Sequence, residues 1–251
     1  MIGPLSYIGG KRRLASQIIA LFPKHVTYCE PFAGGAQVLF GKEPSKVEAL
    51  NDLDLDIVNF FRVCQLHYEE LVRHLKFTVS SRAWFDLLKE TKPESLTDIQ
   101  RAARYFFLMK NCYAGLVRKK HFAWSKAGPN RFNPERIPAL IEETHQRLAR
   151  VQIENLPYEK VIEHYDSKET LFYLDPPYYN IRLYNHNLEH DDFVRMAELL
   201  AGIRGKFVLS LNDVPEVRAI FKRFTIRGIE LHYTAQKKAG KRFKEVLITN
   251  F

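Results

Sequence analysis

Cysteine is scarce in this chain, and its spacing excludes the cysteine-based metal and redox sites. The three cysteines, Cys29, Cys64 and Cys112, are odd in number, far apart, and form no Cys-x-x-Cys pair. This usage is typical of reduced core residues in a cytosolic protein. His186 and His190 stand four residues apart, but no third ligand accompanies them. The sequence therefore predicts no metal site.

Long apolar runs and glycine-rich phosphate signatures are also missing. No stretch is long enough to cross a bilayer, and there is no signal peptide, so we expect a cytoplasmic protein with no membrane partner. The fingerprint G-x-G-x-x-G does not occur, which disfavours a dinucleotide site that binds phosphates.

The charge balance and the aromatic content favour nucleic acid as a partner. Lysine and arginine number 38 against 29 aspartates and glutamates, which gives a formal net charge of +9 over 251 residues. Aromatic residues make up 13% of the chain. Cations bind phosphates, and aromatic rings stack on bases or wedge between them.

Strand and helix patterns alternate at both ends of the chain and stop in the middle. Alternation over 1–56 and 151–251 predicts an α/β fold with a doubly wound, mostly parallel sheet. Two final apolar runs, 227–233 and 243–251, predict a terminal antiparallel hairpin and bring the sheet to about seven strands. The middle third, 57–150, is expected to be a helical insert.

Helical periodicity in the middle third is clearest over three segments, 57–75, 82–89 and 99–109. A further helix is expected over 138–150. Between them, a turn-rich basic patch over 111–136 predicts a loop or hairpin carried by the helices.

The most informative motif is the tetrapeptide Asp175-Pro176-Pro177-Tyr178. It follows an apolar run, 170–174, that reads as a buried strand, so a carboxylate emerges where open α/β sheets place their ligand crevice. The prolines stiffen the turn and lack N–H groups, which leaves carbonyls as acceptors beside the carboxylate. Acceptors next to a tyrosine ring suit a planar group with an amine, such as a nucleobase.

Two further elements follow the first two predicted strands. The loop Pro31-Phe32-Ala33-Gly34-Gly35 lets the backbone approach a ligand closely, although a tight strand-to-helix turn explains the paired glycines as well. Asp52 ends the second strand, where an acid can bind both hydroxyls of a ribose. A helix N-cap is the alternative for Asp52.

A third element, Tyr7-Ile8-Gly9-Gly10-Lys11, offers a ring, two flexible residues and an ammonium group that can close over a carboxylate. A capped helix start is the alternative reading. Together, the three elements suit a ligand that carries a ribose and a free amino-acid end but no phosphates. S-adenosylmethionine fits this description, and its sulfonium methyl needs no metal to react.

These motifs, in this order, resemble the Dam-type DNA adenine-N6 methyltransferases over nearly the whole chain. The Gly-Gly-Lys element comes first, then the Pro-Phe-x-Gly loop, the acidic strand end at Asp52, a target-recognition insert and the Asp-Pro-Pro-Tyr motif. The later segments 188–193, 208–213 and 242–247 are similar too. The resemblance implies a site-specific enzyme with S-adenosylmethionine as cofactor and a methyltransferase-type sheet.

The resemblance also implies roles for individual residues. It assigns cofactor contacts to Tyr7, Lys11, Phe32, Gly34, Gly35, Asp52 and Asp175. It makes Asp175, Pro176, Pro177 and Tyr178 the catalytic motif that holds a flipped adenine. The family often has tryptophan where Tyr7 stands, and tyrosine keeps a ring for stacking.

The basic patch in the insert resembles the family's recognition hairpin. Arg118 is expected to bind a guanine with two hydrogen bonds, and Tyr113 to wedge into the base stack. Lys119, Lys120 and Arg131 are expected to bind phosphates. A solvated basic loop is the alternative.

Two departures bear on the DNA sequence that is recognised. Relatives that read GATC typically have asparagine where Ala114 stands and lysine where Ser6 stands. Neither side chain here can act as such a polar reader, so the recognition sequence stays open, as does the choice between a restriction-modification enzyme and an orphan or phage enzyme.

Three alternatives remain at this level. Relatives of this sheet methylate cytosine N4 or a protein glutamine amide, but these usually have serine or asparagine where Asp175 stands. RNA is a possible substrate, although the long insert favours duplex DNA. A non-catalytic DNA-binding protein would be expected to lose Asp175, Tyr178 or the glycine loop. We therefore expect a monomer that acts on double-stranded DNA, with no obligate protein partner, in a bacterial or phage-infected cell.

Overall fold

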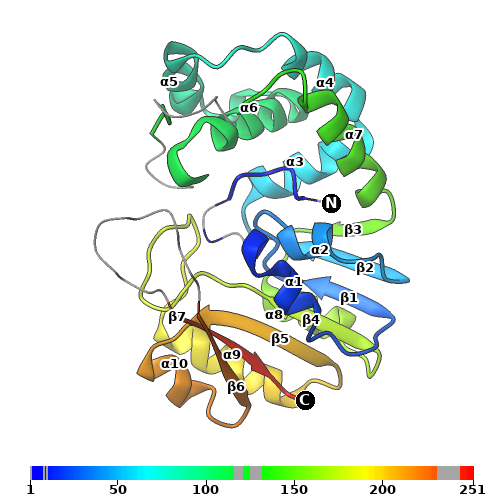
Figure 1. Ribbon diagram of the computed structural model, residues 1–251, viewed down its shortest axis with the longest axis vertical. Coiled ribbons are helices and arrows are strands. Elements are labelled where there is room, and N and C mark those ends of the chain that lie inside the picture. The colour runs from blue at the N-terminus through cyan, green and yellow to red at the C-terminus, as the bar shows by residue number, and fades with distance from the viewer. Residues whose placement is uncertain (1, 8, 10, 116–120, 125–131, 231–243) are drawn as a thin grey trace.

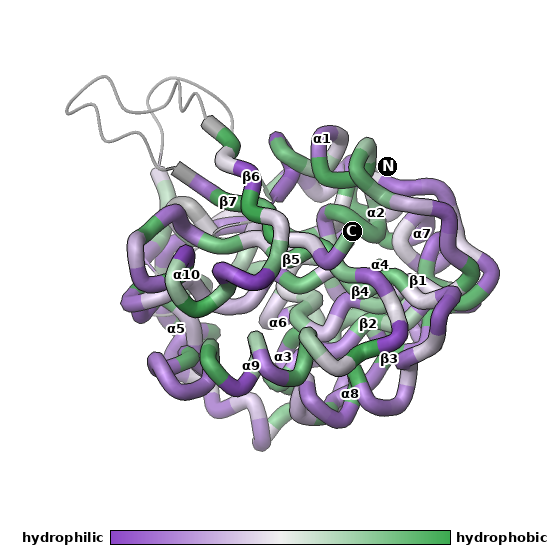
Figure 2. Tube along the Cα trace, turned by 90° about the horizontal axis from the view of Figure 1, so that it is seen from below, coloured by the Kyte–Doolittle hydropathy of each residue, from purple (hydrophilic) through white to green (hydrophobic). Residues whose placement is uncertain are grey.

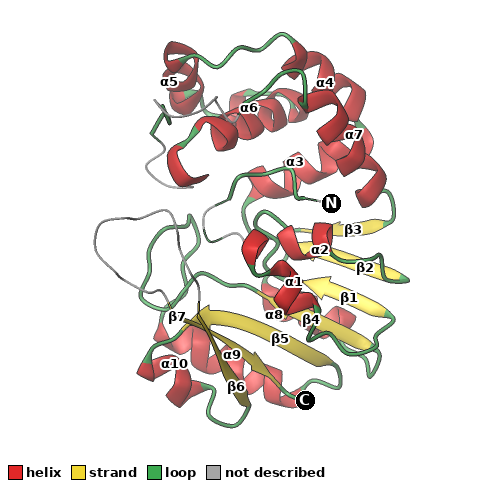
Figure 3. Cartoon of the chain, viewed as in Figure 1, coloured by secondary structure: helices red, strands yellow, loops and turns green. Residues whose placement is uncertain are grey.

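The computed structural model describes the chain except residues 1, 8, 10, 116–120, 125–131 and 231–243. One mixed sheet forms its centre, with helices on both faces and a group of helices at one end (Figures 1 and 3). Within the described residues, no helix is long and apolar enough to span a membrane.

The sheet has seven strands in the order β3-β2-β1-β4-β5-β7-β6. Their bounds are β1 Thr27–Glu30, β2 Val47–Asn51, β3 Val151–Glu154, β4 Thr170–Leu174, β5 Lys206–Asn212, β6 Thr225–Glu230 and β7 Lys244–Thr249. Strands β1 to β5 pair in parallel, and β7 pairs antiparallel with both β5 and β6. The predicted α/β sheet with an antiparallel end is confirmed.

Strand β4 is buried along its whole length because both of its faces are covered. All five of its residues are buried. Leu171 and Tyr173 pack into the core on one face of the sheet, whereas Phe172 and Leu174 pack into the core on the other. This alternation of side chains is the period of two that a strand imposes.

Different helices cover the two faces. The short helices α1 (Ala15–Ile19) and α2 (Gln37–Gly41) contribute to the first core, and α8 (Tyr158–Tyr165), α9 (His190–Gly202) and α10 (Pro215–Ile220) contribute to the second. Hydrophilic stretches are frequent on the outer turns of the trace (Figure 2). This three-layer arrangement leaves the carboxyl ends of the parallel strands free for a site.

The middle third forms a group of helices above the sheet (Figure 1). Their bounds are α3 Leu55–Leu66, α4 Tyr68–Lys76, α5 Arg82–Glu90, α6 Asp98–Asn111 and α7 Ile137–Leu148. Helix α6 begins with a capping box formed by Thr97 and Gln100. The buried faces of these helices share the first core with the sheet.

The single helix expected over 57–75 is wrong, because the chain breaks at His67. His67 has φ −138° and ψ 38°, which ends α3 and redirects α4. The break brings the Tyr68 ring onto His145 of α7, with ring centroids 4.3 Å apart. Local periodicity continues through this point, so only the packing of α4 against α7 reveals the break.

A buried ion network joins the helical insert to the sheet. Arg147 of α7 donates to Glu48 of β2 through Nη1 at 2.5 Å and Nη2 at 2.9 Å, and Lys42 donates to the same carboxylate at 2.6 Å. Burial raises the pKa of Glu48, but the hydrogen bonds from Arg147 and Lys42 outweigh it and hold the pKa below its usual value. The network fixes the insert relative to the edge of the sheet.

Candidate active site

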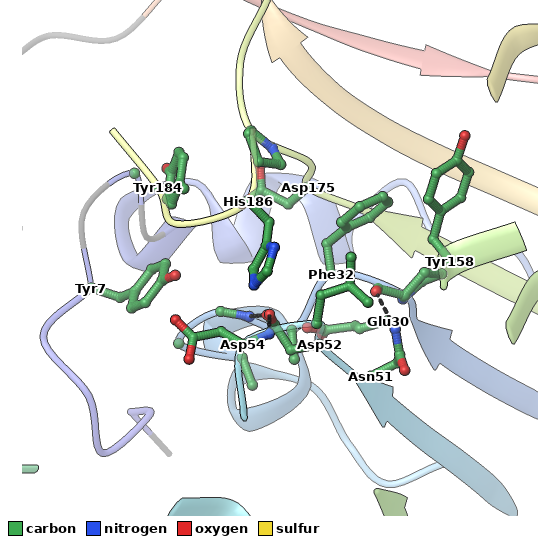
Figure 4. Close-up of a pocket in the computed structure, with 18 of the residues that line it drawn as sticks. Tyr7, Glu30, Phe32, Asn51, Asp52, Asp54, Tyr158, Asp175, Tyr184 and His186 are labelled. Atoms are coloured by element: carbon green, nitrogen blue, oxygen red, sulfur yellow. Dashed lines mark hydrogen bonds between the residues drawn. The ribbon is translucent and has the colours of Figure 1, made fainter. Parts of the chain in front are cut away.

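A cavity of about 550 Å³ opens at the carboxyl ends of β1, β2 and β4. Strands β1 and β4 are neighbours in the sheet, and the strand order runs outward in opposite directions from them. The loops that follow them therefore separate and leave a crevice, which is where doubly wound sheets bind ligands. Figure 4 shows side chains from the first loop, the strand ends and a later loop around this cavity.

The glycine loop after β1 lies close to the Tyr7 ring. Gly34 has φ +47°, and a Cβ there would lie 3.0 Å from Cε1 of Tyr7. A Cβ at Gly35 would lie 2.9 Å from Cβ of Tyr7. Glycine is therefore required at position 34 for its backbone conformation, and at both positions because a side chain would meet Tyr7.

Asp52 lies at the end of β2 and orders the glycine loop. Its Oδ2 accepts the N–H of Gly34 at 2.8 Å, and its Oδ1 accepts the N–H of Asp54 at 2.9 Å. Burial raises the pKa of Asp52 to about 6, against the lowering effect of these hydrogen bonds. Each carboxylate oxygen has a second lone pair, so Asp52 can still accept hydrogen bonds from the hydroxyl groups of a ligand in the cavity.

The cavity wall is acidic although the protein as a whole is basic. The acidic residues that line it are Glu30, Asp52, Asp54, Glu159, Asp175 and Asp192, whereas Lys11 is the lysine or arginine among its lining residues. Burial raises the pKa of Glu30 to about 8, and its Oε1 accepts from the Tyr28 hydroxyl and the Leu39 N–H. Glu30 is therefore mostly protonated near neutral pH, and the other carboxylates of the wall favour a ligand that carries positive charge.

Asp175 is held through one of its two oxygens. Oδ1 accepts from Lys11 Nζ at 2.7 Å and from Ser210 Oγ at 2.8 Å. Lys11 Nζ also donates to the Tyr178 hydroxyl at 2.7 Å and to the Gly9 carbonyl at 3.2 Å. Among the described residues, both donors to Asp175 use Oδ1, which leaves Oδ2 available to accept from a ligand.

The turn after Asp175 is held by the end of β5. Asn212 accepts the N–H of Tyr179 at 3.0 Å and donates to the Tyr179 carbonyl at 3.1 Å. No hydrogen bond between described residues uses the Pro176 carbonyl. The turn is therefore fixed while this acceptor stays free.

A strap formed by residues 184–188 contributes to the lining of the cavity. Asn185 donates to Asp54 Oδ2 at 2.9 Å, and the ring of Tyr184 stacks on Tyr7 with centroids 6.0 Å apart. His186 lies between Asp175 and Asp52 in Figure 4. The strap thus connects the loop after β4 with the loop after β2.

The predicted site residues divide into those that line the cavity and those beside it. Lining residues are Tyr7, Lys11, Phe32, Gly34, Gly35, Asp52, Asp175 and Pro177. Pro176 and Tyr178 are not among them, and the Tyr178 hydroxyl accepts a hydrogen bond from Lys11, which does line the cavity. The three elements named from the sequence therefore meet around one cavity, next to the Asp-Pro-Pro-Tyr turn.

Comparison with known proteins identifies the family. Residues 7–235 match the family described as D12 class N6 adenine-specific DNA methyltransferase. The chain belongs to this family. It is an S-adenosylmethionine-dependent DNA adenine-N6 methyltransferase, which confirms the Dam-type resemblance and decides against the cytosine, amide and non-catalytic alternatives.

The similar proteins are also named as methyltransferases. The type II methyltransferase M1.LlaDCHI of Lactococcus lactis subsp. cremoris is 27% identical, over 98% of this chain and 94% of its own. The type II methyltransferase M.MjaIII of Methanocaldococcus jannaschii is 26% identical, over 98% of both chains. A DNA N-6-adenine-methyltransferase of Escherichia phage P1 is 25% identical over 86% of this chain and 30% of its own.

In this D12-class enzyme the base of the predicted recognition hairpin is formed in the insert. Cys112 and Phe122 make an antiparallel bridge, and the N–H of Tyr113 donates to the His121 carbonyl at 2.9 Å. Tyr113 is 64% exposed. Arg118, Lys119, Lys120 and Arg131 lie outside the described residues, as does the Ala114 side chain, so their roles stay predictions.

Sequence reasoning missed several residues of the D12-class site. Glu30 and Ser210 were not selected, although each is a polar residue in or at the end of an apolar strand. Glu245 is a similar case, because it is a buried acid in β7. Tyr184 and Asn185 carry no comparable signal, since only the path of the strap brings them to the cavity. Within the described residues, no cluster of metal-ligating side chains occurs.

Proposed function

We propose that this chain methylates a specific adenine in duplex DNA after the base has been flipped out of the helix. The observation that carries the proposal is the free Oδ2 of Asp175 beside the unused Pro176 carbonyl, at the edge of an acidic cavity. An adenine N6 inside a duplex cannot reach an enclosed methyl donor, so extrusion is required.

The cavity fits S-adenosylmethionine. Its volume suits a ligand of that size, and its acidic wall matches the sulfonium and ammonium charges. Asp52 would accept the ribose hydroxyls, with Phe32, Gly34 and Gly35 along the adenosine. Tyr7 and Lys11 would lie toward the amino-acid end. When bound, this cofactor supplies an electrophilic methyl group that adenine N6 takes by direct in-line attack, without a covalent enzyme intermediate.

The protein contributes positioning and electrostatics. Asp175 Oδ2 and the Pro176 carbonyl would accept the two N6 protons and so favour a pyramidal nitrogen with a localised lone pair. Tyr178 would stack on the flipped base, with its hydroxyl held by Lys11. Pre-arranged groups of this kind lower the barrier because they need no reorganisation during the reaction.

The helical insert would read the DNA sequence. Tyr113 at the exposed base of the hairpin would wedge into the base stack, and Arg118 would bind a guanine. Lys119, Lys120 and Arg131 would contact phosphates. The contact with DNA would be asymmetric, which favours a monomer. The type II relatives suggest a role in restriction-modification.

Sequencing of modified bases tests this function directly. Plasmid DNA that lacks adenine methylation would be incubated with the protein and S-adenosylmethionine, then sequenced with detection of N6-methyladenine. We expect methylation at one short sequence and none with the Asp175→Ala variant. Methylation of cytosine, or of no base, would contradict the proposal.

A further inference from the structure

We propose that Glu245 of β7 is a positioning residue for methyl transfer, because its carboxylate offsets the charge of Lys11 beside Asp175. This inference rests on the proposed function and adds a residue to it. In this arrangement Asp175, Lys11 and Glu245 together carry one negative charge, which stabilises the positive charge that develops on adenine N6.

Glu245 is buried with an unsatisfied oxygen. The residue is 5% exposed, and its Oε2 has no hydrogen-bond partner among the described residues. Oε2 lies 3.9 Å from Lys11 Nζ, the same ammonium group that binds Asp175 and the Tyr178 hydroxyl. A buried polar atom without a partner costs stability, so its presence in a native protein calls for an explanation, of which a catalytic role is one.

Lys11 has no donor left for Glu245. Its three N–H groups have three acceptors, which are the Gly9 carbonyl, Asp175 Oδ1 and the Tyr178 hydroxyl. Glu245 therefore acts on Lys11 through charge, and burial strengthens such an interaction over its value in water. The pKa of Glu245 is raised overall, mainly by burial and further by the charge of Asp175, whereas Lys11 and Tyr178 act against this rise and favour the ionised form.

The charge balance matters because methyl transfer moves a positive charge. When bound, S-adenosylmethionine would give its methyl group to N6 and leave as the neutral thioether S-adenosylhomocysteine. The positive charge would then lie on N6, next to Asp175, until N6 releases a proton to solvent. Lys11 by itself would cancel Asp175 and repel the developing charge. With Glu245 present, the buried group keeps an excess of one negative charge beside the place where the positive charge appears.

A purely structural role does not explain an acid at this position. Glu245 pairs with Asn212 of β5 and Ile229 of β6, and the next three residues of β7 are fully buried apolar side chains. An apolar residue would satisfy the same backbone pairing without an orphaned oxygen. Removal of one partner from a buried ion pair destabilises a protein when the other charge is left alone. Loss of the Glu245 charge leaves Lys11 paired with Asp175 at 2.7 Å, so no buried charge loses its last partner.

The test is the isosteric variant Glu245→Gln, compared with Glu48→Gln as a buried structural control. We expect kcat of Glu245→Gln to fall by at least ~10-fold. Its affinity for S-adenosylmethionine by calorimetry and its KM for DNA should stay within about twofold, and its Tm should be unchanged or higher. Glu48→Gln should show the opposite pattern, with a lower Tm and an unchanged kcat.

Two results would overturn the inference. One is an unchanged kcat for Glu245→Gln, and the other is a fall in kcat that comes with the loss of Tm seen in Glu48→Gln. Failure of the proposed function is distinguishable, because the wild-type protein would then leave adenine unmodified before any variant is compared.

Discussion

Lys11 and Asp175 are 164 positions apart in the chain, and Lys11 Nζ lies 2.7 Å from Asp175 Oδ1. The pair joins the amino-terminal loop to the end of β4, and Ser210 of β5 adds a second donor to the same oxygen. Three separate segments thus fix the orientation of one carboxylate. Its second oxygen accepts no hydrogen bond from a described residue, and we propose that it accepts one from the substrate.

Asp175→Ala should nearly abolish methyl transfer while the fold survives. We expect kcat to fall by ~10²–10³ or more, because the acceptor for N6 is lost. Calorimetry should still detect S-adenosylmethionine binding. The control is Asp191→Ala, which removes an exposed acid of α9 and should leave kcat unchanged. Near-normal turnover by Asp175→Ala would reject the role given to this acid.

Gly34→Ala should weaken cofactor binding and destabilise the protein. The new Cβ would meet the Tyr7 ring at 3.0 Å, in a backbone conformation with φ +47° that alanine adopts poorly. The cost should be about 1–3 kcal/mol in the free energy of unfolding, measured by urea denaturation. Gly202→Ala is the matched control, since its Cβ would have no neighbour within 4 Å. Equal stability of the two variants would contradict the strain argument.

Arg147→Met should destabilise the protein strongly through the helical insert. Loss of the guanidinium leaves Glu48 buried with Lys42 as its remaining cation, and breaking such a pair costs about 3–5 kcal/mol. Arg73→Met removes an exposed partner of Glu70 and serves as the control, with little expected change. The urea midpoints of the two variants and the wild type measure these effects, and equal midpoints for Arg147→Met and Arg73→Met would contradict the prediction.

The pH dependence of stability should reveal Glu30. Burial raises the pKa of Glu30 to about 8, so the folded state holds a proton that the unfolded state releases near pH 4.5. Stability contributed by the protonated group is complete below about pH 4.5 and is lost progressively up to about pH 8.

Glu30→Gln removes this titration. Urea midpoints of the variant and the wild type should therefore diverge in favour of the variant as the pH rises from about 5 to 8. Parallel curves over that range would show that Glu30 keeps an ordinary pKa in the folded protein.

Apolar runs and the alternation of strand and helix patterns predicted much of the fold, because the spacing of apolar residues reflects which side chains are buried. The apolar run of β4 and the alternation around it indicated a covered sheet, and Asp175 followed from its place at the strand end. The break at His67 was missed because helical periodicity continues on both sides of it. What redirects α4 is its packing against α7, which no local window contains.

The site was predicted as separate motifs, and their contacts were not. Asp52 was interpreted as a ribose ligand or a helix cap, whereas its carboxylate also orders the glycine loop through Gly34. Lys11 was assigned to the cofactor, and its ammonium group binds Asp175 and Tyr178. Contacts of this kind depend on which strands are neighbours, and that information is spread over the whole chain.

The sequence by itself determined the family, adenine-N6 methylation and the layered α/β architecture. Motif order can be read along the chain, and side-chain periodicity records which residues are buried. The tertiary structure decided which groups share charge and hydrogen bonds. It placed Lys11 between Asp175 and Glu245. Strand order brings β4, β5 and β7 side by side, and that order places the distant Asp175 and Glu245 within 4 Å of the same ammonium group.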